Sequence, residues 1–511
     1  LVRLSTEIAN RVLIIQQLVG MLQDPSTAAR EQAAAAIANL ARESTANCTS
    51  IVEAGGIPPL LRLLTSESAK AKENSASAIS QLARGSRPNQ NAIGKAGGIP
   101  LLVGTLTASS SNKGGDASQG QIETIVLHTI WNLAKKNFAN QVALVEAGAI
   151  APLVQMLGNA SAEMQLPATG AIECLLHAKD IQASIVRTGA IAPLCTLARD
   201  GMIETQEQAS AALWSLSTDN LPNKTTIAKL GGIEALVKMV ATGGSDKAQR
   251  NAAGALTTLA SRHEQNREAI AKRIVRLLMS DQGLYGKVDT AVTCRALVAL
   301  TRMCGRKMAD DETQSHSLSA DDTANQLALF KAGGVGAIIG WLSYTNEDVQ
   351  REAAHALLAM AIANVQTQAQ ILKVEGLAGL IGVVNSNNLE AQKHAAVALW
   401  HLAYSTENQL AIAEAGGIPA LVSMLGAAGT TEGARGAELA CATLVRLVQG
   451  NPKVSVAVAE AGGIPPLVLL LKTTNNASQQ AAAALAELSL VAHNRDPIIN
   501  AGGVEPLLKL L

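Results

Sequence analysis

The chain has 511 residues, of which 48% are hydrophobic and only 2% aromatic, so any core must be built from Ala, Leu, Ile and Val. Lys plus Arg equal Asp plus Glu at 41 each, which leaves no broad basic surface for nucleic acid or an anionic membrane. With so few aromatic residues, an extended platform for stacking bases is excluded as well.

A short phrase recurs along the chain. It reads IVEAGGIPPLLRLL at 51–64, IAEAGGIPALVSML at 412–425 and VAEAGGIPPLVLLL at 458–471. The apolar residue that follows the glycines recurs at Ile15, Ile57, Ile99, Ile150, Ile191, Ile233, Ile274, Val335, Leu377, Ile418, Ile464 and Val504. Most of these steps are 41 or 42 residues long. The sequence therefore predicts one repeated structural unit along 1–511.

Each unit is predicted to hold three helices. Gly-Gly ends a short first helix, and Pro opens an apolar second helix where it costs no hydrogen bond. A longer, Ala-rich third helix follows, as at 28–41, and a Leu or Met near its end recurs at Leu40, Leu82, Leu133, Leu175, Leu216, Leu259, Leu300, Met360, Leu402, Leu447 and Leu488. We call this residue the anchor.

An Asn precedes the apolar part of many first helices. It stands four residues before an apolar residue at Asn47, Asn89, Asn140, Asn223, Asn266, Asn325, Asn408 and Asn494. A side-chain oxygen at this place can accept hydrogen bonds from the free amides of a helix start. We expect these residues to cap the first helices.

Three stretches depart from the period. Residues 107–120 lengthen the loop between a second and a third helix, and we expect a mobile loop there. At 266–279 the glycines are missing, which predicts that the first and second helices run together; Lys272, Arg273 and Arg276 alternatively form a basic patch. Residues 303–324 add an acidic, Ser-containing segment, which we interpret as a tolerated insertion, with a regulatory loop as the alternative.

This three-helix unit, with its EAGGIPPLV corner, resembles the armadillo repeat over essentially the whole chain. The resemblance implies an all-α, right-handed superhelical solenoid, 1–511, of about eleven repeats and a partial twelfth, whose third helices line the concave side. In their regularity and Ala content, and not in any binding motif, the units are similar to vacuolar-type and plant-type armadillo scaffolds. The chain begins without Met and ends inside an apolar pattern, so we expect a fragment of a longer protein.

Helical geometry selects candidate residues on the third helices. Positions one and two before the anchor lie about 100° and 200° around the helix from it, so both can face the concave surface or its flanks. Three of the four tryptophans, Trp131, Trp214 and Trp400, share the position two before the anchor, while Trp341 falls on a second helix and is predicted to be core. Each of the three is either an anchor for a bound peptide or packed against a neighbouring third helix.

The candidate binding residues come from three positions of the third helix, one, two and five residues before the anchor. They are Asn39, Gln81, His128, Trp131, Asn132, Trp214, Ser215, Thr258, Arg295, His355, Trp400, His401, Arg446 and Glu487. Polar side chains would bind the backbone of an extended partner segment, and the tryptophans would contact its side chains. Third helices about 9 to 10 Å apart and about 3.3 Å per extended residue give roughly three ligand residues per repeat.

The sequence therefore predicts a noncatalytic scaffold or adaptor that binds other proteins through extended segments. A structural spacer that uses the convex face and loops is the alternative. The residue one before the anchor is polar in most repeats. A nuclear import adaptor is disfavoured because no Trp stands four residues before this polar position. A catenin-type function is disfavoured because basic residues are scarce at the candidate positions of the third helices. No catalytic motif is present, so we expect no enzyme activity, cofactor, metal or small-molecule substrate.

The cysteines and hydropathy bear on location. The chain has six cysteines and no C-x-x-C pair, which favours reduced thiols that fill the core rather than disulfides or a zinc site. No run approaches the roughly 20 apolar residues of a membrane span, and no signal peptide is visible. We expect a cytoplasmic protein, with a nuclear or membrane-peripheral location as alternatives.

Overall fold

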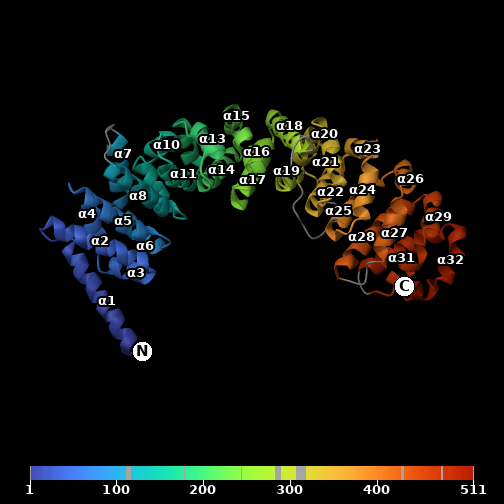
Figure 1. Ribbon diagram of the computed structural model, residues 1–511, viewed down its shortest axis with the longest axis horizontal. Helices are drawn as coiled ribbons and strands as arrows, with labels where there is room; N and C mark the ends of the chain where they lie inside the picture. Colours follow the sequence, from blue (N-terminus) through green and yellow to red (C-terminus); the bar gives the residue numbers. More distant parts are fainter. Residues whose placement is uncertain are drawn as a thin grey trace. The chain divides into compact units, whose positions relative to one another are not determined.

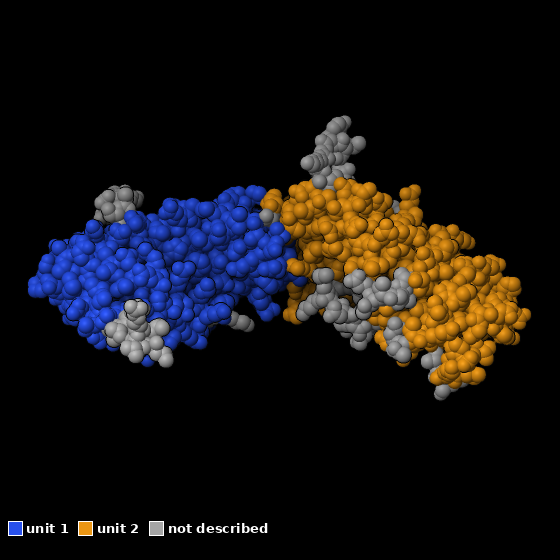
Figure 2. Space-filling model, turned by 60° about the horizontal axis from the view of Figure 1, so that its bottom comes forward, with its two compact units in different colours: residues 1–239, 243–258 blue, residues 240–242, 259–511 orange. Residues whose placement is uncertain are grey.

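The computed structural model describes residues 2–110, 117–159, 161–177, 179–242, 244–281, 289–305, 318–373, 375–426, 431–473 and 476–509. Within these ranges every regular element is a helix, as predicted (Figure 1). The chain divides into two compact units, residues 1–239 with 243–258 and residues 240–242 with 259–511, which Figure 2 colours separately. We describe each unit by itself.

The helices repeat in the predicted order of short, short and long. The first helices are α3 (Thr45–Glu53), α6 (Arg87–Lys95), α9 (Phe138–Glu146), α12 (Lys179–Arg187), α15 (Leu221–Lys229), α20 (Ala320–Lys331), α23 (Val365–Lys373), α26 (Thr406–Glu414), α29 (Pro452–Glu460) and α32 (Arg495–Asn500), the last after the 3-10 turn η1 (Ala492–Asn494). The second helices are α4 (Ile57–Leu63), α7 (Gly98–Ser110), α10 (Ile150–Asn159), α13 (Ile191–Asp200), α16 (Gly232–Thr242), α21 (Gly334–Leu342), α24 (Gly376–Val384), α27 (Gly417–Leu425), α30 (Ile464–Leu470) and α33 (Val504–Leu508).

The third helices pack on one another in series within each unit. They are α2 (Thr27–Glu43), α5 (Ala69–Ala83), α8 (Ala117–Ala134), α11 (Ala162–Leu175), α14 (Ile203–Ser217), α17 (Asp246–Ala260), α19 (Thr290–Met303), α22 (Glu347–Ala361), α25 (Leu389–Leu402), α28 (Thr431–Val448) and α31 (Asn476–Ser489). Every anchor residue after Leu40 is fully buried, so this row forms the centre of the core of each unit. The first repeat begins with a single helix, α1 (Val2–Met21).

The glycine pair forms the corner between the first and second helices. Gly55 has φ +76°, a left-handed conformation that glycine adopts without steric cost. At Gly56 a Cβ atom would lie 2.8 Å from Cγ2 of Ile51, so the close approach of the two helices also requires glycine. Three corners between a first and a second helix turn the chain by 88°, 82° and 86°; the last has a glycine pair, and the other two have Gly-Ala. Within the described residues no single helix is long and apolar enough to cross a membrane, and these three bent pairs reach that length only when their helices are added together.

The repeated Asn does not cap the first helix, and that prediction was wrong. Its side-chain Nδ2 donates instead to a backbone oxygen at the end of a third helix, at 2.7–3.3 Å in all eight repeats. In seven of the eight the acceptor belongs to the anchor Leu itself, as between Asn223 and Leu216. The first helix is capped three residues earlier, where Oδ1 of Asn220 accepts from the amide of Asn223. An Asn is suited to the inner position because its amide supplies a donor for a carbonyl left free at a helix end.

The three departures from the period have different outcomes. The first and second helices near 266–279 do run together, as α18 (Glu264–Asp281). The predicted loop at 107–120 is shorter than expected, because α7 extends to Ser110 and α8 begins at Ala117, and residues 111–116 lie outside the described residues.

The acidic segment at 303–324 is also partly helical. Ser319 and Asp322 form a reciprocal cap at the start of α20, and Asp321 accepts hydrogen bonds from the Ser261 hydroxyl and the Arg262 amide. Asp321 also forms an ion pair of 3.1 Å with Arg267. These contacts stabilise the entry to α20, so Asp321 and Asp322 do not belong to a tolerated or regulatory loop. Residues 306–317, including Ser315 and Ser317, lie outside the described residues.

Candidate functional site

The third-helix face of each unit carries the predicted binding residues. Asn39 is exposed, and the side chains that are half-buried are those of Gln81, His128, Trp131, Asn132, Ser215, Thr258, Arg295, Trp400, His401, Arg446 and Glu487. Trp214 is 40% exposed. Apart from His355, these side chains therefore have at least part of their surface accessible. Seven of the fourteen differ clearly in their surroundings and form three groups.

The first group consists of Trp131 and Trp214, which pack on the next third helix. A Cβ atom at Gly170 of α11 would lie 2.3 Å from Cε2 of Trp131, and one at Gly254 of α17 would lie 2.8 Å from Cη2 of Trp214. Each indole thus covers a glycine in the middle of the neighbouring helix. This is the lateral packing that was one of the two alternatives for the tryptophans.

The second group consists of residues that are occupied within the protein. His355 is only 5% exposed, and its ring stacks on that of His394 with centroids 4.4 Å apart. Arg295 donates to the backbone oxygens of Val240 and Ala241, at 3.1 and 2.7 Å. His355 and Arg295 are therefore engaged within the protein, and their contact with a partner segment stays a prediction. Their position on the helix did not reveal these internal contacts, because it does not show what the adjacent helix presents.

The third group surrounds Trp400 and Arg446 in the second unit. The Cζ atom of Arg446 lies 4.2 Å from the centroid of the Trp400 ring, and the ring of His401 meets the same indole edge-on, with centroids 4.8 Å apart. A guanidinium over an indole face gains a cation–π attraction, which fixes the orientation of Arg446.

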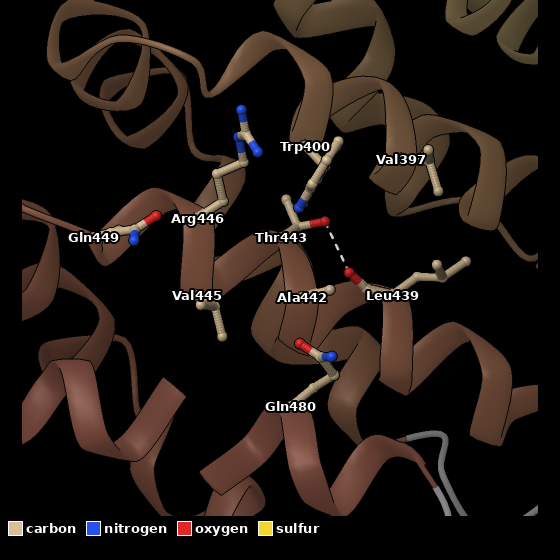
Figure 3. A pocket seen from close by; sticks show the side chains of 9 residues that line it. All are labelled: Val397, Trp400, Leu439, Ala442, Thr443, Val445, Arg446, Gln449 and Gln480. Atoms are coloured by element: carbon tan, nitrogen blue, oxygen red, sulfur yellow. Dashed lines mark hydrogen bonds between the residues drawn. The ribbon is translucent and has the colours of Figure 1, made fainter. Parts of the chain in front are cut away.

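Trp400 and Arg446 line a cavity of about 420 Å³, drawn in Figure 3. Its lining comes from three consecutive third helices and the residue after one of them: Val397 and Trp400 of α25; Leu439, Ala442, Thr443, Val445 and Arg446 of α28; Gln449 just beyond; and Gln480 of α31. A volume of this size lies within the range of small-ligand and side-chain pockets. We refer to it as the Trp400 cavity.

The polar groups of the Trp400 cavity differ in their partners. The Thr443 hydroxyl is already engaged with the backbone oxygens of Leu439 and Ala396, at 2.8 and 3.1 Å (Figure 3). In contrast, Nε of Arg446 is buried and has no hydrogen-bond partner within the described residues. No Asp or Glu contributes to the lining. The cavity therefore combines apolar walls with a cation, Arg446, that has no counterion in the part of the chain that the structure describes.

Sequence reasoning identified Trp400 and Arg446 but missed the rest of this lining. A signal was present in the sequence. The position five before the anchor is Gly170, Gly254 or Ala442 in the repeat that follows each of the three tryptophans, and it is larger in several other repeats, such as His128 and His355. A small residue there leaves room for the indole from the preceding repeat.

The other predicted functional chemistry concerns cysteines and metals. All six cysteines are free, and all but Cys294 are buried, in agreement with core thiols. Trp341 is 2% exposed, and its indole nitrogen donates to the Leu278 oxygen, which confirms the prediction that it belongs to the core. Among the described side chains, no group of three or more His, Cys, Asp or Glu could hold a metal ion.

The family model for the Armadillo/beta-catenin-like repeat matches residues 44–84, 137–173, 179–218, 220–261 and 451–489. Each matched segment runs from a first helix into a third helix, in the phase that the structure shows. The chain is an armadillo-repeat solenoid. The Trp400 cavity thus lies on the third helices of three successive armadillo repeats.

One solved structure agrees with this fold, and two further structures are similar over about half of the chain. An engineered protein from the Northeast Structural Genomics Consortium is 25% identical, with a TM-score of 0.54, and the alignment covers 93% of this armadillo chain and 98% of that one. A designed armadillo repeat protein is 27% identical over 48% of this chain and 99% of its own, with a TM-score of 0.44. Another, in complex with the peptide (KR)4, is 25% identical over 48% of this chain and 99% of its own, with a TM-score of 0.43. No curated protein matches the chain.

Proposed function

We propose that this armadillo solenoid is a noncatalytic scaffold that holds extended segments of partner proteins along its third helices. The observation that carries the proposal is the Trp400 cavity, whose walls come from α25, α28 and α31. An extended peptide that follows the repeats would cross successive third helices, and this cavity is lined by three of them. Its apolar walls and few polar side chains match the mixture of contacts found in peptide sites.

The role of the tryptophans follows from their packing. Trp131 and Trp214 lie over glycines of the next helix, so we assign them mainly to the stacking of repeats. Trp400 lines a cavity, and we assign it the role of anchor for a partner side chain. Aromatic residues next to Arg are common among the side chains that dominate binding energy at interfaces.

Selection from a random library of displayed 12-residue peptides against the full chain tests this function. We expect peptides that bind the wild type and lose affinity about tenfold or more with Trp400→Ala, since truncation of a central aromatic anchor often costs 2 kcal/mol or more. Leu469→Ala is the matched control, because Leu469 is 64% exposed on the second helix α30 and is not part of the cavity. Failure to select any peptide, or equal losses with the two variants, would contradict the proposal.

A further inference from the structure

The Trp400 cavity holds a guanidinium next to an indole. The Cζ atom of Arg446 lies 4.2 Å from the centroid of the Trp400 ring. A cation–π contact uses no N–H hydrogen bond, so the guanidinium keeps its N–H donors for other partners. Because those N–H groups form a planar fork, their best partner is a carboxylate held by two parallel hydrogen bonds.

Within the described residues the cation has no counterion. No described carboxylate lies at ion-pair distance from Arg446, whereas Arg435 of the same helix is paired with Glu438 at 2.7 Å. Among the described residues the buried Nε atom of Arg446 has no hydrogen-bond partner. Because that atom is inaccessible, a ligand in the cavity would contact the terminal Nη groups of the guanidinium, which can donate two parallel hydrogen bonds.

The remaining walls suit a side chain that is apolar near its backbone and acidic at its tip. Val397, Leu439 and Val445 supply apolar surface, and Gln449 and Gln480 carry amides that can donate to an anion. No Asp or Glu lines the cavity, so a negative charge entering it meets no direct repulsion from the lining.

From this charge complementarity we infer that the Trp400 cavity binds the carboxylate of an Asp or Glu side chain in an extended partner segment, with Arg446 as the residue that determines specificity. The inference rests on the proposed function and adds the chemical class of the ligand. It concerns an acidic side chain of a peptide, and a free C-terminal carboxylate or a phosphate group would appear as a different outcome of the test.

The test exchanges the charge in the cavity. The displayed 12-residue library, free of phosphate and with the peptide C-terminus fused to its carrier, is selected separately on the wild type, on Arg446→Glu and on Lys472→Glu. Lys472 is exposed after the second helix α30 and lies outside the cavity, so Lys472→Glu has the same change in net charge. Arg446→Gln, which keeps much of the side-chain volume, is included in case the charge reversal impairs folding, and circular dichroism verifies each variant.

We expect wild-type and Lys472→Glu selections to share a position enriched in Asp or Glu, and Arg446→Glu to enrich Lys or Arg at that position instead. A synthetic peptide in which that acid is changed to its amide should bind the wild type about tenfold more weakly or worse, and this difference should vanish with Arg446→Gln. Peptides that bind at the cavity with no acidic preference, or that require a free C-terminus or a phosphate, would overturn this inference and leave the proposed function standing. Failure to obtain any binding peptide would count against the proposed function itself.

Discussion

The indole of Trp131 lies directly on Gly170 of the next third helix, so closely that a Cβ atom on residue 170 would stand 2.3 Å from Cε2 of the ring. Glycine in the middle of a helix normally weakens it by about 0.5–1 kcal/mol relative to alanine. Here the glycine is required because the neighbouring repeat places a large side chain over it. The same relationship recurs between Trp214 and Gly254.

Gly170→Ala should therefore lower the melting temperature, although most Gly→Ala changes inside helices raise stability. Trp131→Leu combined with Gly170→Ala should recover part of the loss, because the smaller side chain leaves space for Cβ. Gly104→Ala in α7 is the control, since a Cβ there meets no atom within 4 Å, and it should be neutral or stabilising. A Gly170→Ala variant as stable as Gly104→Ala would show that the indole is not held on residue 170.

Asn223 tests the newly found cap of the third helix. Its amide donates to the Leu216 oxygen at 2.9 Å while the side chain is only 5% exposed. Asn223→Asp retains the shape but removes the donor and buries a carboxylate, so it should cost about 1–3 kcal/mol in denaturant unfolding. Asn220→Asp should have little effect, because Asp serves as well as Asn at a helix start. Equal losses at the two positions would argue against the distinct roles of these neighbours.

The turn after the third helix offers a test of backbone strain. Ala363 has φ +52°, where Gly85 in the corresponding turn has φ +71°. A left-handed conformation costs an ordinary L-residue about 1–2 kcal/mol, so Ala363→Gly should stabilise the chain by up to about 1 kcal/mol and Gly85→Ala should destabilise it. Denaturant midpoints of the two variants should shift in opposite directions, and shifts of the same sign would refute the account.

The thiols provide a prediction about pH. Burial raises the pKa of Cys174, Cys195 and Cys441 to about 12, and burial with nearby acids raises the pKa of Cys294 to about 11. Since only the thiolate reacts, labelling of the native chain at pH 8 should be far slower than in denaturant, and Cys294 should be labelled first because it alone is half-buried.

The same pKa values affect folding. A thiol whose pKa is higher in the folded chain than in the unfolded chain binds more protons when folded, so the free energy of unfolding should fall as the pH rises above about 9 toward these raised values. Substitution of Cys441 by Ser should reduce that decline. Rapid labelling of a buried thiol in the native chain would contradict the burial assigned to it.

The sequence predicted the repeats, their corners and the fused helix α18, because these depend on local chemistry such as glycine conformation and apolar spacing. It misplaced the role of the Asn, since a side chain that can either donate or accept does not reveal which neighbouring helix end it meets. It also could not distinguish Trp400 from Trp131, which share one helical position. The difference lies in the next repeat, where Ala442 borders a cavity and Gly170 is covered by the ring.

The central claim is that partner segments bind on the third helices, and the most direct test is to locate a selected peptide on the full chain. A peptide that carries a photoactivatable residue at its centre would be cross-linked and the attachment sites mapped by mass spectrometry. We predict attachment to α25, α28 or α31 around the Trp400 cavity, for example at Gln480, with loss of cross-linking in Trp400→Ala. Attachment to second helices such as α30, unchanged by Trp400→Ala, would contradict the claim.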